Sequence, residues 1–320
     1  CFQISRQRVI LITTFAGFLC DKIEPALRQA VYERTAKAIA EDMQGKFPDF
    51  QGSRSNLEVC ILRYLAEQEN FEDFKQYLKF PKDFFQTYID TRVQSHCLDA
   101  RVRLERFLYS SLNLLFKKIL SAVSLSTQIV KDRKDREEKI SLWLDEFCRE
   151  LTEVISLPRS DLKCIEHREV TDIDILSRVM AEALGDMRDR LVKEFADADM
   201  SSFSTQPQMV LAEHFSECWT HCPFCGAVLS VVFHQTQAFL GDTWWRCSPG
   251  IDYNTHTLML AICSSLVARD CKFIFGRGPW ISHGSYHNAG PPFSTWTILP
   301  DSSMQAYWKW FVSHFRTQLE

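Results

Sequence analysis

The sequence predicts a mainly α-helical protein, with a bundle of long helices followed by a small, loop-rich α+β domain. The first 200 residues hold four glycines, four prolines and one tryptophan, whereas the last 120 hold seven of each. Before residue 200, apolar residues also recur every three or four positions, which is the spacing of a helix face. We therefore expect a stalk-like helical bundle over residues 1–205 and a compact domain over residues 206–320.

Length and composition are those of an ordinary soluble protein. The 320 residues are enough for two domains, and 46% of them are hydrophobic and 24% charged, with a formal net charge of −4. So small a charge gives no overall attraction to nucleic acid or to an anionic membrane. The twelve cysteines form no compact, regularly spaced framework, which suits a reducing compartment. We therefore expect a cytoplasmic protein, with the nucleus as a second compartment.

The start of the chain shows no targeting or membrane-spanning pattern. The apolar run at residues 9–12 is too short to cross a bilayer, and Arg6, Arg8 and Asp21 lie around it. The chain begins at Cys1 rather than at a methionine. We therefore expect the sequence to be a piece of a longer polypeptide.

The first predicted element is a long helix over residues 4–44, or a pair of helices kinked at Pro25. Its apolar stripe begins with Ile10, Phe15, Phe18, Leu19 and Ile23. A loop follows at residues 45–52, after which Ser55 is a candidate cap of the next helix. The inner face of that helix would carry Leu57, Ile61, Tyr64 and Leu65.

An aromatic cluster follows between residues 71 and 88. Its members are Phe71, Phe74, Tyr77, Phe80, Phe84, Phe85 and Tyr88. Their spacing is helical and Pro81 interrupts it, so they form a core stripe or, as the alternative, the wall of a ligand pocket. A further long helix is expected over residues 90–130. The mixed charges of residues 131–139 indicate a solvated helix face or a turn between helices.

Two more helices complete the bundle, because residues 140–154 and 171–195 each carry an apolar stripe. Thr171 is expected to start the second of them. In the second domain we expect, in order, an amphipathic turn over residues 210–219, a helix over 255–269, a strand over 271–275, a loop over 280–297 and a last helix after Asp301 and Ser302.

A metal site is predicted at the motif Cys222-Pro223-Phe224-Cys225-Gly226. Two cysteines separated by two residues form a knuckle whose thiolates point to one ion, and the glycine lets the chain fold back around them. His234 lies nine residues after Cys225, and Cys247 lies thirteen residues after His234. Together Cys222, Cys225, His234 and Cys247 would form a closed Cys3His site, a ligand set that zinc prefers in structural roles.

Other interpretations of the knuckle remain open. The two cysteines could be buried free thiols, or a redox pair, although no βαβ pattern surrounds Cys222. Cys222 and Cys225 are the firmest ligands, and the other two are best guesses. The reserve ligands are His221, His256 and Cys263.

Catalytic motifs are not found in the sequence. No Gly-x-x-x-x-Gly-Lys-Ser/Thr loop, Gly-x-Ser-x-Gly elbow or His-Glu-x-x-His helix occurs. His234 is not followed by a glutamate two residues later, so the deaminase pattern fails too. His256, His283 and His287 have no assigned role. Whether the chain is an enzyme therefore stays open.

The C-terminal motifs carry a family likeness. Cys222-Pro223-x-Cys225-Gly226 is followed by residues 263–267 (Cys-Ser-Ser-Leu-Val), and the chain closes with residues 296–303 (Trp-x-Ile-x-Pro-Asp-Ser-Ser) and 307–310 (Tyr-Trp-Lys-Trp). This order resembles the C-terminal end of the interferon-inducible very large GTPases, relatives of the dynamin-like immune GTPases. The helical part is also similar, with Asp73-Phe74-x-x-Tyr77 placed before Pro81 as in that family.

The resemblance implies a function for the parent protein in innate immunity. It implies that GTP is bound and hydrolysed by an upstream domain, since these 320 residues hold no motif for that chemistry. This sequence differs from the family pattern at residues 247–250, where the family has a second histidine followed by a basic residue and a proline. Cysteine can replace histidine as a zinc ligand, so the site can survive this change.

Three functions compete at this point. The first is an interaction and assembly module in which the helices self-associate or bind protein partners and a zinc knuckle fixes the C-terminal end. The second is a zinc-knuckle nucleic-acid reader, which the net charge of −1 over residues 201–320 (six Lys and Arg against seven Asp and Glu) disfavours. The third is a zinc-dependent hydrolase, which would need an open coordination position.

Overall fold

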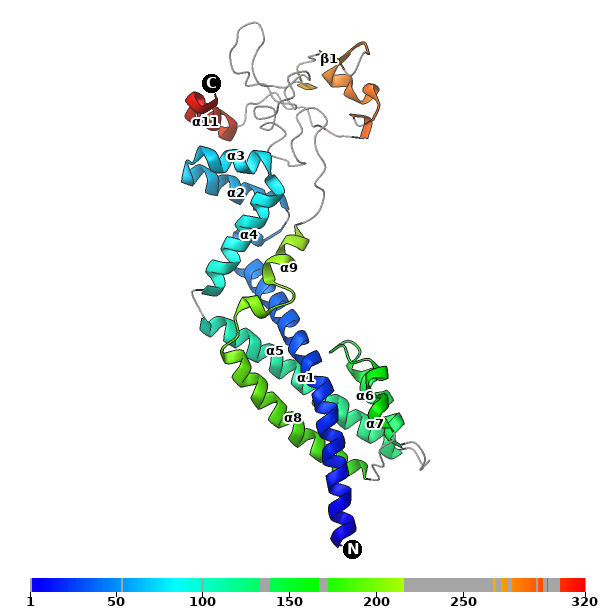
Figure 1. The fold of residues 1–320 in the computed structure, drawn as a ribbon. Helices are drawn as coiled ribbons and strands as arrows, with labels where there is room; N and C mark the ends of the chain where they lie inside the picture. The colour runs from blue at the N-terminus through cyan, green and yellow to red at the C-terminus, as the bar shows by residue number, and fades with distance from the viewer. Residues whose placement is uncertain are drawn as a thin grey trace. The chain divides into compact units, whose positions relative to one another are not determined.

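The residues described by the computed structural model are mainly helical (Figure 1). They are residues 2–52, 54–98, 101–132, 139–166, 172–215, 267–268, 272–274, 278–291, 293–295, 298 and 306–319. The prediction of a mainly α-helical protein is confirmed for them. Whether zinc stabilises an α+β domain near the C-terminus stays a prediction.

The chain divides into two compact units, each made of two stretches of sequence. Unit 1 comprises Cys1–Met43 and Val93–Val210, and unit 2 comprises Gln44–Arg92 and Leu211–Glu320. Residues 44–92 thus group with the C-terminal part and not with the other helices that precede residue 205. Whether residues 206–320 form a domain of their own stays a prediction.

Unit 1 is built from long helices. They are α1 (Phe2–Lys46), the C-terminal part of α4 (Pro81–Leu98), α5 (Arg101–Asp132), α6 (Lys139–Leu151), α7 (Lys163–Glu166), α8 (Ile173–Ala196) and the start of α9 (Pro207–His214), with the 3-10 turns η2 (Arg159–Leu162) and η3 (Met200–Ser202). Helix α5 packs against α6 and α8. The stripes predicted for α6 and α8 are buried, including Trp143, Phe147 and Met187 at 0% exposure.

Polar contacts attach α1 to α5 and α8. Thr35 Oγ1 donates a hydrogen bond of 3.0 Å to Ser111 Oγ, and both residues are buried. The Arg28 guanidinium donates to both carboxylate oxygens of Glu194 at 2.7 and 3.0 Å. The Glu24 carboxylate accepts a hydrogen bond from Arg28 and another, of 2.7 Å, from Arg190. Two acids and two bases therefore alternate along the surface where α1 meets α8.

Unit 2 combines a helical part with a small sheet. Its elements are η1 (Pro48–Phe50), α2 (Arg54–Gln68), α3 (Phe71–Lys79), the N-terminal part of α4, β1 (Lys272–Ile274), β2 (Trp280–Ser282), η5 (His283–Ala289), η6 (Phe293–Thr295), α11 (Ala306–His314) and α12 (Arg316–Leu319). Strands β1 and β2 are antiparallel, with Phe273 opposite Ile281. Gly52 follows η1 with a φ of 80°, a conformation that glycine adopts without strain.

Aromatic side chains join α3 to the last two helices. Phe74 is 2% exposed, and its ring centroid lies 4.9 Å from that of Phe311 and 5.2 Å from that of Phe315. Trp310 is 6.0 Å from the same ring. Tyr307 donates its hydroxyl to the carbonyl oxygen of Leu62 in α2 at 2.7 Å. This part of the predicted aromatic cluster is therefore packed core.

Several sequence predictions needed correction. The helix expected over residues 90–130 is divided between α4 and α5, and a strand, β2, begins within the loop expected over residues 280–297. Asp172, not Thr171, caps α8, because its carboxylate accepts the N–H groups of residues 174 and 175 at 3.0 Å each. Ser55 lies inside α2 rather than at its cap. The residues predicted on core faces but found exposed are Ile10, Phe18, Tyr64 and Phe80.

Candidate functional site

The predicted zinc ligands lie outside the residues that the structure describes. This holds for Cys222, Cys225, His234 and Cys247, and also for the reserve ligands His221, His256 and Cys263. Within the described residues, no group of three or more His, Cys, Asp or Glu side chains is placed to hold a metal ion. The zinc site therefore stays a prediction that rests on sequence spacing.

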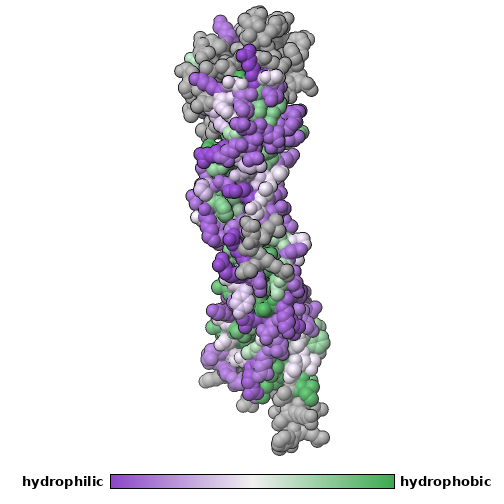
Figure 2. Space-filling view, turned by 90° about the vertical axis from the view of Figure 1, so that its left-hand side faces the viewer, coloured by the Kyte–Doolittle hydropathy of each residue, from purple (hydrophilic) through white to green (hydrophobic). Residues whose placement is uncertain are grey.

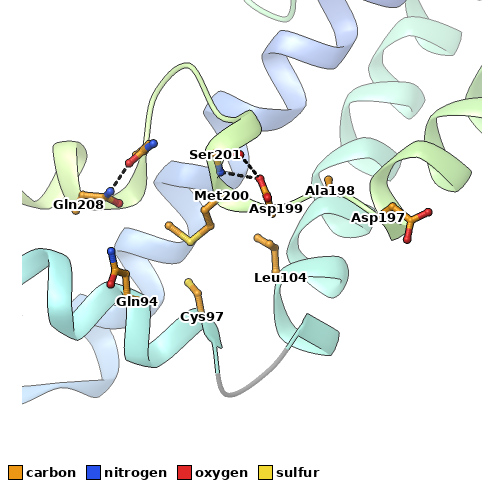
Figure 3. A pocket seen from close by; sticks show the side chains of 10 residues that line it. Gln94, Cys97, Leu104, Asp197, Ala198, Asp199, Met200, Ser201 and Gln208 are labelled. Carbon is orange, nitrogen blue, oxygen red and sulfur yellow. Dashed lines mark hydrogen bonds between the residues drawn. The ribbon is translucent and has the colours of Figure 1, made fainter.

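The described residues of unit 1 line a partly open cavity of about 680 Å³ (Figure 3). This volume is in the range of small-molecule sites. Its lining comes from α4, α5, the segment after α8, and the start of α9: Gln94, Cys97, Leu104, Asp197, Ala198, Asp199, Met200, Ser201, Gln206 and Gln208. Figure 3 shows Cys97, Leu104 and Met200 pointing into the same space from three of these segments.

The thiol in this cavity is a poor nucleophile. Burial raises the pKa of Cys97 from 9.0 to about 11, and the nearby Arg103 opposes that shift only in part. The thiol is therefore protonated at neutral pH, whereas nucleophilic attack needs the thiolate. Cys97 contributes an apolar, polarisable wall rather than a reactive group.

The histidine next to Cys97 cannot activate it. An Arg103 N–H contacts His96 Nδ1 at 2.8 Å, and because a guanidinium has no acceptor, Nδ1 must accept this bond. The ring proton is therefore assigned to Nε2, which donates to Asp42 Oδ2 at 3.2 Å. The Asp–His pair resembles part of a catalytic triad, but the nitrogen that would take a proton from a thiol is occupied by arginine.

The charged groups among the described residues that line the cavity are the carboxylates of Asp197 and Asp199. Hydrogen bonds from the Ser201 hydroxyl and N–H lower the pKa of Asp199, so its carboxylate is ionised at neutral pH. Gln208 donates its amide to Gln206, while its own Oε1 is buried and receives no hydrogen bond from the described residues. Among the described residues that line the cavity there is no lysine, arginine or histidine. The arrangement can bind a hydrogen-bond donor, but the described residues supply no nucleophile–base pair.

Sequence reasoning did not find this cavity, for a physical reason. Its lining residues come from stretches around positions 94–104 and 197–208, which only the packing of several helices brings together. No local motif marks them. The one available signal was the polar stretch between α8 and α9, which interrupts the helical periodicity.

None of the helices built from described residues combines the length and apolar character that a bilayer-spanning segment needs. The described residues thus define a mainly α-helical protein with a cavity that offers hydrogen-bonding groups. The family model described as the C-terminal domain of interferon-induced very large GTPase 1 matches residues 218–320. The human and mouse proteins of that name are 36% and 35% identical to this chain over all of its length.

The chain belongs to the interferon-inducible very large GTPase family and corresponds to its C-terminal region. It spans 13% of the length of each of the two curated relatives. No solved structure matches it. The likeness read from the C-terminal motifs is therefore confirmed.

Proposed function

We propose that this region is an interaction and assembly module of a very large GTPase. Self-association is its main activity, and protein partners are the alternative use of the same surfaces. The observation that carries the proposal is the set of large apolar side chains that the long helices of unit 1 leave exposed. They are Ile10 (58%), Leu11 (45%), Phe18 (43%), Tyr109 (47%), Leu114 (38%) and Leu125 (46%).

Exposed apolar groups that gather on one helix mark contact surfaces in soluble proteins, while single ones are ordinary. The described residues that line the cavity supply no nucleophile–base pair that would favour an enzymatic function over this proposal. Binding and hydrolysis of GTP belong, in this proposal, to an upstream domain of the parent protein, as the names of the two relatives suggest. We place the protein in the cytoplasm, with the nucleus as a second compartment.

Zinc has a structural part in the proposal. Cys222, Cys225, His234 and Cys247 would hold one ion and stabilise the region that matches the family model. The purified 320-residue chain should then contain about one zinc ion per chain by elemental analysis. Replacing both Cys222 and Cys225 by serine should remove it, whereas Cys164→Ser, at an exposed cysteine, should not. A metal-free wild-type chain that is fully folded would contradict the zinc proposal.

The assembly proposal has a direct test in solution. Sedimentation equilibrium of the 320-residue chain, from about 1 to 100 µM, should show a reversible monomer–dimer transition. A chain that stays monomeric over this range would contradict self-association. The zinc measurement is independent of this result, so each part can fail alone.

A further inference from the structure

The cavity in unit 1 combines an apolar wall with a carboxylate. Cys97 and Leu104 are 9% and 7% exposed, and Figure 3 shows that they and Met200 point into the same space. Asp199 belongs to the same lining and lies on the segment between α8 and α9. We propose that this cavity binds a small organic cation, namely a primary amine with an apolar body. This inference goes beyond the proposed assembly function and does not depend on it.

The apolar wall can bury the body of such a ligand. Burial raises the pKa of Cys97 to about 11, so the thiol is uncharged at neutral pH. Together with Leu104 and Met200 it offers a thiol, an isobutyl group and a thioether, which are soft apolar contacts. On the face drawn in Figure 2, the described side chains are largely hydrophilic, with scattered hydrophobic ones. Three apolar side chains gathered in one cavity therefore favour an aliphatic or aromatic group there.

Asp199 supplies the charge that would select a cation. Its Oδ1 accepts the Ser201 N–H at 2.9 Å and the hydroxyl groups of Ser201 and Ser202. These bonds hold the carboxylate in place and lower its pKa. Because all three end on Oδ1, Oδ2 accepts no hydrogen bond from the described residues. The donors are neutral serine groups, so these bonds leave a full negative charge on Asp199.

The described lining holds no cation that would occupy this position. It includes no lysine, arginine or histidine, whereas Asp197 adds a second carboxylate. Arg103, whose charge acts on the Cys97 thiol, is not part of the lining. Its guanidinium donates to His96 Nδ1 at 2.8 Å and to the His96 carbonyl oxygen at 3.0 Å. The lining therefore presents negative charge, which a positively charged ligand complements.

An organic cation suits this cavity better than a metal ion does. Within the part of the chain that the structure describes, no three His, Cys, Asp or Glu side chains are grouped to hold a metal. Hard cations take six or more oxygen ligands, and a protonated thiol such as Cys97 is not a metal ligand. An ammonium group donates up to three hydrogen bonds and brings an apolar chain with it. Asp199 and the apolar wall match these two parts.

The test uses hexylamine as the probe and the full 320-residue chain, labelled with carbon-13 in its methionine methyl groups. The chain has seven methionines, and the signal of Met200 is the one that Met200→Leu removes. At neutral pH, hexylamine should shift this signal and saturate in about the millimolar range, as expected for a ligand of so few atoms. Hexan-1-ol has the same chain without the charge and should bind about three- to fivefold more weakly.

Asp199→Asn tests the charge while it keeps the turn, because asparagine retains an oxygen that can cap η3. It should weaken hexylamine binding about three- to fivefold, the range of an exposed ion pair, and leave hexan-1-ol binding unchanged. Asp189→Asn is the matched control, since Asp189 is an exposed acid on α8 that lies outside the cavity lining. It should leave the binding of both probes unchanged.

The possible results separate the site from its selectivity. A Met200 signal that hexylamine does not shift up to about 10 mM overturns the site. Equal affinities for hexylamine and hexan-1-ol, or an Asp199→Asn variant that binds hexylamine as well as the wild type does, overturn the selection of a cation. Equal losses in Asp199→Asn and Asp189→Asn also overturn it, because the effect would then follow the net charge of the chain.

Discussion

Phe74 is the residue whose removal should most directly loosen the last helices of the chain. Its side chain is 2% exposed and contacts the rings of four residues, Tyr307, Trp310, Phe311 and Phe315. Replacing a buried phenylalanine by alanine costs about 3–5 kcal/mol, from lost burial and from the cavity left behind. Phe74→Ala should cost an amount in this range within unit 2.

Hydrogen exchange of the α11 amides measures this loss locally. If α11 opens when its contact with α3 fails, a loss of about 3 kcal/mol should speed exchange more than 100-fold. Phe80→Ala is the control, because Phe80 is the C-cap residue of α3 but is 54% exposed, and its removal should change exchange little. Equal exchange rates in the two variants would refute the role given to Phe74.

A double-mutant cycle shows whether the contact itself carries the energy. Phe311→Ala alone should also be costly, because Phe311 is 1% exposed and 4.9 Å from Phe74 between centroids. When both are removed, the total cost should be smaller than the sum by about 0.5–1.5 kcal/mol. Strict additivity would mean that the two rings stabilise their helices independently.

Three smaller predictions concern unit 1. Trp143→Phe should cost about 1–3 kcal/mol in urea unfolding, because it removes ring volume and the 3.1 Å bond from the indole N–H to Thr127 Oγ1. Glu194→Gln should cost only about 0.5–1 kcal/mol, and less at high salt, because the ion pair with Arg28 is partly exposed. Burial raises the pKa of Cys97 from 9.0 to about 11, so the folded state holds this proton more tightly than the unfolded state does. Its contribution to stability should therefore be complete below about pH 9 and lost as pH rises towards 11, and Cys97→Ala should reduce that pH dependence in urea unfolding.

The long helices were predictable because apolar spacing alone determines them. The buried stripes of α6 and α8, including Trp143 and Met187, occupy the positions that the 3.6-residue period assigns. The period cannot tell which apolar positions of a helix are buried and which are exposed. Ile10 and Phe18 were therefore assigned to the core together with Phe15, yet they lie on the exposed side of α1.

Contacts between segments that are distant in the sequence could not be predicted from it. The cavity near Cys97 and the contact of Phe74 with α11 both depend on which helices pack together, and no local pattern carries that information. The assigned tautomer of His96 likewise depends on the Arg103 guanidinium, seven residues further along the chain. The zinc ligands are the reverse case. Their sequence spacing predicts them, but they lie outside the described residues.

The stretch that matches the family model is not self-sufficient in its hydrophobic contacts. It begins at residue 218, but Phe311 and Phe315 pack against Phe74, and Tyr307 bonds to Leu62, both of which precede it. Burying a phenylalanine contributes about 1.5–3 kcal/mol, so a fragment of residues 218–320 loses the described contacts of α11 with α2 and α3. We expect α11 in that fragment to exchange its amide hydrogens rapidly, and a separate polypeptide of residues 44–92 to restore protection. The same polypeptide with Phe74→Ala should not, and protection of α11 in the fragment alone would show that residues 218–320 need no partner from the helical part.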